Sequence, residues 1–128
     1  MPKRKAPPRP TKAELAILSI LWRRGPSTVR DVHAALREPV GYTTVLKLLQ
    51  IMTDKGLVTR DERSRTHIYR AAVSEATTQG QLVSDLVDRA FGGSSVALVL
   101  QALSTTPASR DELEQIRRLL DQRKGDKP

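Results

Sequence analysis

The chain has 128 residues, with 22 Lys and Arg against 14 Asp and Glu and a formal charge of +8. No segment approaches the roughly 20 apolar residues of a membrane-spanning helix, and the basic N-terminus lacks the apolar segment of a secretory signal. Cysteine is absent, which excludes disulfides, thiolate metal sites and a cysteine nucleophile. We therefore expect a cytoplasmic protein of one domain or two very small ones.

The basic charge is confined to one half of the chain. Residues 1–72 carry 15 Lys and Arg and 6 Asp and Glu, a net charge of +9. Residues 73–128 carry 7 and 8, a net charge of −1. This asymmetry predicts a polyanionic partner for the first half and a different task for the second. A basic surface without a function is the alternative.

Residues 1–10 contain four prolines and four basic side chains, so we expect a disordered arm that either reaches DNA or solubilises the chain. A capping box over residues 11–14 begins the first helix, and Gly25-Pro26 ends it. The predicted buried stripe of this helix is Leu15, Leu18, Leu21 and Trp22.

Two further helices are predicted before the pattern changes. Ser27 is the expected N-cap of a short second helix that ends before Pro39. Gly41 begins a third helix that runs to about Lys55, and Gly56 ends it in the left-handed conformation. The predicted buried face of the third helix is Val45, Leu48, Leu49 and Met52.

Two strands, residues 57–60 and 67–70, flank a polar turn. Three helices followed by such a hairpin predict a winged helix-turn-helix over residues 11–72. Its exposed hydroxyl and basic side chains suit base edges and phosphates in a DNA groove. The candidate DNA-binding residues are Tyr42, Thr43, Thr44, Lys47 and Gln50 on the third helix, and Arg63, Arg65 and His67 on the hairpin.

The second half, residues 73–123, is predicted to be entirely helical and is followed by a polar tail over residues 124–128. Ser74 caps a first helix, Gly92-Gly93 ends it, and a short apolar helix follows over residues 96–100. Pro107 interrupts that pattern, and a second capping box over residues 109–112 begins the last helix.

About 50 residues in three helices cannot bury this many Leu and Val side chains alone. We therefore predict a helical homodimerisation module, with packing against the N-terminal domain of the same chain as the alternative. The predicted interface residues are Leu82, Leu86, Val87, Phe91, Val96, Val99, Leu100, Leu103, Leu113, Ile116 and Leu120.

Residue patterns typical of enzymes are missing. His33 and His67 have no metal-ligand spacing, and no glycine-rich loop resembles a phosphate-binding loop. We expect no catalytic residue, no metal and no cofactor. The alternatives are a small nuclease with a hidden acidic site and a nucleoid or RNA-binding protein without sequence preference.

Five segments in this order resemble the penicillinase repressor family over about residues 11–123: residues 11–22, 27–32, 41–45, 55–58 and 109–120. The resemblance implies a homodimeric winged-helix repressor that blocks transcription from a palindromic operator. Tyr42, Thr43, Thr44 and Lys47 match the family's recognition helix, while Leu46 and Ile51 depart from its basic or polar side chains.

The resemblance also bears on how such a repressor is released. In antibiotic-sensing members, a membrane metalloprotease sensor leads to cleavage of an Asn-Phe bond in the penultimate helix. The matching stretch here contains Gln101-Ala102, which is the candidate proteolytic site, with such a sensor as the implied partner. Release by copper binding to a Cys-rich tail, as in copper-responsive relatives, is excluded because the chain has no cysteine.

Overall fold

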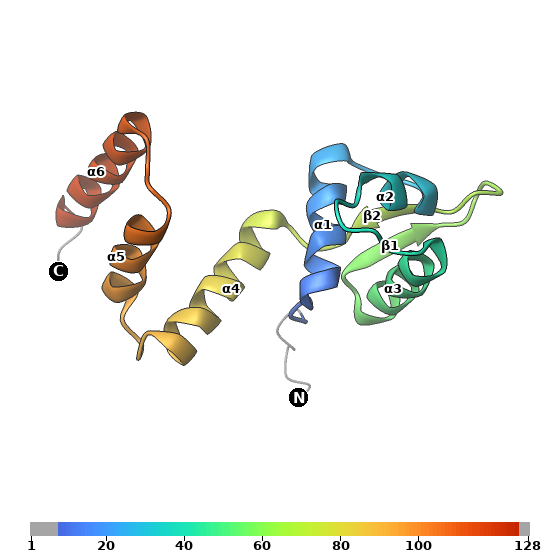
Figure 1. Ribbon diagram of the computed structural model, residues 1–128, viewed down its shortest axis with the longest axis horizontal. Coiled ribbons are helices and arrows are strands. Elements are labelled where there is room, and N and C mark those ends of the chain that lie inside the picture. The colour runs from blue at the N-terminus through green and yellow to red at the C-terminus, as the bar shows by residue number, and fades with distance from the viewer. Residues whose placement is uncertain (1–7, 126–128) are drawn as a thin grey trace. The chain divides into compact units, whose positions relative to one another are not determined.

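The computed structural model describes residues 8–125; residues 1–7 of the predicted arm and 126–128 of the predicted tail lie outside the described residues. The chain divides into two compact units, one through Val83 and one from Ser84, and each is described by itself. The elements follow in the order α1 Lys12–Arg24, α2 Val29–Ala35, α3 Tyr42–Lys55, β1 Val58–Asp61, β2 Ile68–Ala71, α4 Glu75–Ala90, α5 Ser95–Thr105 and α6 Arg110–Gly125 (Figure 1).

The first helix, α1, begins and ends as predicted, but its buried face differs. Thr11 and Glu14 form the capping box, and Gly25 ends the helix with a φ of 86°. The side chains that reach the core include Ile17 and Ile20, whereas Leu15 is only half-buried. The rest of the predicted stripe is confirmed, since Leu18 and Leu21 are buried and Trp22 packs against the core. Because α1 contacts α2, α3 and β2, its buried face is wider than one row of leucines.

The predicted N-cap of α2 was also wrong by one residue. Thr28 is the N-cap and forms a capping box with Asp31. Ser27 is buried and pairs with Tyr69 across an antiparallel bridge, with N–O distances of 3.0 and 2.8 Å. The hydroxyl of Ser27 donates to the carbonyl of Gly25 at 2.9 Å, so it does not cap the helix.

The third helix, α3, has the predicted bounds, and Gly56 follows it in the left-handed conformation with φ 83° and ψ 15°. The N–H of Leu57 donates to the carbonyl of Met52 at 2.9 Å and completes this helix end. Leu57 therefore belongs to the turn, and both strands begin and end one residue later than predicted. The strands are antiparallel, with Val58 opposite Ala71.

The core of the first unit lies between the three helices and the hairpin (Figure 1). Trp22 lies at its edge, where the indole N–H donates to the carbonyl of Val73 at 3.0 Å. Three helices closed by a two-stranded antiparallel hairpin form the predicted winged helix-turn-helix. The fully buried hydrophobic residues outside α1 are Val32, Val45, Leu49, Met52, Leu57, Val58 and Tyr69.

Helices α4 to α6 begin at the predicted residues or within one of them. Ser74 accepts a hydrogen bond from the N–H of Thr77 at 3.0 Å, and Ser94 caps α5. Gly92 and Gly93 separate α4 from α5 with φ angles of 57° and 83°, a conformation that favours glycine. The apolar helix α5 continues to Thr105, beyond the predicted residue 100, and α6 extends into the predicted tail.

A buried ion pair connects the start of α1 to the end of α3. Glu14 is 2% exposed, and its Oε1 accepts hydrogen bonds from the Thr11 N–H at 2.8 Å and from Lys55 Nζ at 2.6 Å. Burial raises the pKa of Glu14, but the hydrogen bonds from Lys55 and Thr11 outweigh it and hold this pKa below its ordinary value.

We expect Glu14→Gln to lower the free energy of unfolding at pH 7 by about 1–3 kcal/mol, because it leaves Lys55 without its charged partner. The folded-state pKa of Glu14 lies below its unfolded value of 4.5, so the carboxylate stabilises the fold above that pH. This stabilisation is lost as the pH falls through the folded-state pKa.

Urea unfolding followed by circular dichroism at pH 7 and at pH 3 measures both effects. The wild type and Glu14→Gln should differ clearly at pH 7 and much less at pH 3. Glu38→Gln is the control, because Glu38 is exposed and has no ion pair among residues 8–125. An equal difference at both pH values would contradict the assigned pKa direction.

Candidate nucleic-acid interface

Helix α3 has one buried and one exposed face. Val45, Leu49 and Met52 are buried in the core. The five predicted DNA-binding residues of this helix are all exposed: Tyr42, Thr43, Thr44, Lys47 and Gln50. The helix therefore presents hydroxyl, amide and ammonium groups over two turns, which is the side-chain chemistry that reads base edges.

A hollow of about 550 Å³ lies between the starts of α2 and α3 and the hairpin. Tyr42, Arg65 and His67, which were predicted from separate segments, all line it. Thr28 and Arg30 of the α2 start also line it and were missed from the sequence. Their signal was the Thr28–Asp31 capping box, which places Arg30 in the exposed first turn of α2.

Two carboxylates reduce the positive charge of the hairpin. Glu62 lies 2.9 Å from Arg60 and 3.9 Å from His67, and Asp61 lies 3.4 Å from Arg63. The N–H of Arg63 also donates to Asp61 at 3.0 Å, and this hydrogen bond lowers the pKa of the Asp61 carboxyl. Within the described part of the chain Arg65 has no carboxylate partner, so it is the hairpin tip's uncompensated arginine.

The start of α3 is held by contacts to α2. The Nε2 of His33 donates to the carbonyl of Val40 at 2.7 Å, just before the N-cap Gly41. The rings of His33 and Tyr42 meet edge to face, with centroids 5.9 Å apart. With the Glu14–Lys55 pair at the other end, both ends of α3 have fixed contacts.

The helices of the second half leave their apolar side chains exposed. Neither α5 nor α6 contains a buried residue, and the exposed fractions reach 66% for Val96 and 62% for Leu100. All predicted dimerisation residues are exposed or only partly buried, and Val83 and Leu119 add to the exposed set at 48% and 51%.

The candidate proteolytic site, Gln101-Ala102, lies inside α5, and both residues are exposed. Cleavage there stays a prediction. Among residues 8–125 no group of three or more His, Asp or Glu side chains is placed to hold a metal ion. No single described helix is long and apolar enough to cross a membrane; α4 and α5 meet such a test only together, as a pair bent by 101°.

Comparison with known proteins gives consistent matches along most of the chain. The family described as penicillinase repressor matches residues 10–122. The chain is 34% identical to the transcriptional regulator BlaI of Mycobacterium tuberculosis (strain CDC 1551 / Oshkosh) over 111 residues, covering 84% of this chain and 79% of that protein.

Two more distant relatives are matched over nearly their whole length. The methicillin resistance regulatory protein MecI of Staphylococcus aureus (strain N315) is 19% identical, over 88% of this chain and 94% of its own. The penicillinase repressor of Bacillus licheniformis is 20% identical, over 94% of this chain and 95% of its own. On the family match and the mycobacterial relative, the chain belongs to the penicillinase repressor family.

Proposed function

We propose that the chain is a cytoplasmic transcriptional repressor that binds a palindromic double-stranded DNA operator as a homodimer. We assign DNA contact to residues 11–72 and dimerisation to residues 73–123. The observation that carries the proposal is the hollow beside α3, where Tyr42 and the uncompensated Arg65 lie together. The family's regulators and repressors support the same function.

The exposed face of α3 supports base recognition in a major groove. Thr43 and Thr44 offer hydroxyl donors, acceptors and methyl groups, and Lys47 offers a donor for guanine O6 or N7. Arg30 borders the hollow from the first turn of α2 and Arg65 borders it from the hairpin loop, and contact of such side chains with the sugar-phosphate backbone positions a recognition helix.

The exposed apolar faces of α4 to α6 support the homodimer. An apolar surface of this extent is typical of an interface between proteins. A second copy supplies a matching surface without any other partner, and a two-fold interface repeats the same contacts on both sides. Two recognition helices related by this axis read two half-sites about 34–36 Å apart.

The central experiment is selection of bound sequences from a random DNA library. We expect an enriched palindrome with half-sites about one helical turn apart. A nucleoid or RNA-binding protein would instead enrich no sequence and would show a steep salt dependence for every duplex. That result would overturn the proposal.

Lys47→Ala and Arg65→Ala should weaken binding to the selected operator in different ways. Losing a base contact at Lys47 should cost about 1–3 kcal/mol and relax specificity at one position of each half-site. Losing a phosphate contact at Arg65 should weaken binding to all sequences alike and reduce the salt slope by about one per protomer. Gel-shift titrations at several salt concentrations measure both.

The matched control for both variants is Arg110→Ala, which removes one exposed positive charge from the start of α6. Its operator affinity should equal that of the wild type. If Lys47→Ala also binds like the wild type, with specificity and salt slope unchanged, the assigned recognition face is wrong.

Leu86→Asp should convert the dimer to a monomer, because it places a carboxylate in the proposed apolar interface. Leu86 is 49% exposed in the single chain, so the protomer itself should still fold. Sedimentation velocity should show half the mass, and affinity for the full palindrome should fall about a hundredfold or more. Ser84→Asp, at an exposed position of the same helix, is the control. A dimeric Leu86→Asp would contradict the assigned interface.

A further inference from the structure

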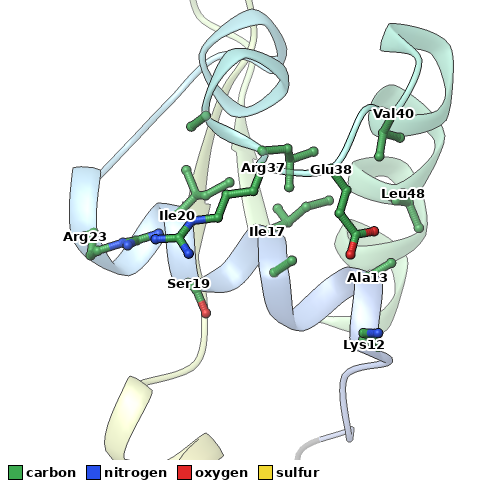
Figure 2. A pocket seen from close by; sticks show the side chains of 13 residues that line it. Lys12, Ala13, Ile17, Ser19, Ile20, Arg23, Arg37, Glu38, Val40 and Leu48 are labelled. Carbon is green, nitrogen blue, oxygen red and sulfur yellow. The ribbon is translucent and has the colours of Figure 1, made fainter.

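A second pocket, of about 480 Å³, lies between α1 and the turn that joins α2 to α3 (Figure 2). It shares no residue with the hollow beside α3. Its half-buried apolar side chains include Leu36, Val40 and Leu48 of α3, whereas Ile17 and Ile20 of α1 also line it but are buried in the core. The volume lies within the range of about 300–1,000 Å³ that is typical of sites for small organic molecules.

Three positive side chains, Lys12, Arg23 and Arg37, also line this pocket, against one carboxylate, that of Glu38. In Figure 2 the side chains of Arg23 and Arg37 point toward one another at one end. Neither arginine has an ion-pair partner within residues 8–125, whereas Lys55, for example, is paired with Glu14.

Two guanidinium groups at one end of the pocket give that end a positive potential, which favours an anion there. Their planar sets of N–H donors suit a carboxylate, sulfonate or phosphate group with two or more acceptor oxygens. An apolar lining that ends at two unpaired arginines is therefore complementary to a molecule with an apolar body and one anionic group.

We propose that this pocket binds a small organic anion, with its apolar body against Leu36, Val40 and Leu48 and its anionic group beside Arg23 and Arg37. The pocket is apolar over most of its lining and positively charged at one end, and it is large enough for one small molecule.

The pocket is connected to the start of the recognition helix. Arg37 and Val40 belong to the turn that leads into Gly41, and the carbonyl of Val40 accepts the hydrogen bond from His33. A ligand that contacts this turn and Leu48 touches α3 at its start and along its half-buried flank, one turn from Thr44. We infer that the bound ligand changes the protein's affinity for the operator, and that the operator changes its affinity for the ligand by the same factor. This inference rests on the proposed function.

The probe for the pocket is naphthalene-2-sulfonate, with uncharged 2-naphthalenemethanol as its counterpart. Titration of the full-length protein followed by amide NMR should shift signals of α1 and of residues 35–40. We expect the sulfonate to bind about tenfold to a hundredfold more tightly than the alcohol. Equal affinities, or shifts confined to α4–α6, would overturn the proposal.

Two variants test the two parts of the pocket. The double variant Arg23→Gln/Arg37→Gln should remove the preference for the sulfonate. Ala16→Trp, which places a large side chain at a lining position, should abolish binding of both probes. Ala34→Trp, at an exposed position of α2 that does not line the pocket, should bind like the wild type.

Circular dichroism melting of each variant confirms that it folds. Probe binding retained in Ala16→Trp would place the probe elsewhere. If the double variant weakens DNA binding and leaves the sulfonate preference intact, the two arginines bind DNA phosphates and the proposal is wrong.

The coupling is tested by measuring the sulfonate affinity with and without the selected operator. A change of about threefold or more in either direction supports the effector role, and an unchanged affinity overturns it. If the library selection finds no operator, the proposed function fails, while the titration of the free protein still decides whether the pocket binds anions.

Discussion

The buried carboxylate of Glu14 determines how α3, the proposed recognition helix, is held. A carboxylate that is 2% exposed has to be paired, and its partners come from the start of α1 and the end of α3. Because Lys55 is the last residue of α3, this pair anchors the helix end farthest from the hollow. The contacts of His33 with Val40 and Tyr42 anchor the other end. With both ends held, the packing of Val45, Leu49 and Met52 in the core determines which face of α3 is exposed to solvent.

The two parts of the chain differ in how completely they bury their apolar surface. In the first unit, α1, α3 and the hairpin enclose a core in which Leu49, Met52 and Leu57 are fully buried. In α5 and α6 no residue is buried, although seven of the 11 residues of α5 are Val, Leu or Ala. A single chain therefore buries the apolar side chains of its first part, whereas most apolar side chains of α5 and α6 stay at least partly exposed to solvent.

Features that depend only on residues a few positions apart in the chain could be predicted from the sequence. The capping boxes of Thr11 and Ser109 and the left-handed Gly56 depend on neighbours a few residues away, and all three are present. The buried position of Ser27 could not be predicted in this way, because it depends on Tyr69 of a distant strand. The same limit applies to the hollow, where Arg30 joins Arg65 only through tertiary packing.

The ion pairs of the hairpin have a consequence for how the wing would meet a nucleic acid. Asp61 and Glu62 act as internal counterions for Arg63 and Arg60. A phosphate that approaches these arginines has to displace a carboxylate, so contact there is an exchange of partners with little net gain. Among the arginines of the hairpin loop, only Arg65 can bind a phosphate without first losing a carboxylate partner. In the proposed complex the wing contributes less to affinity than its number of arginines suggests, and we assign discrimination between sequences to α3.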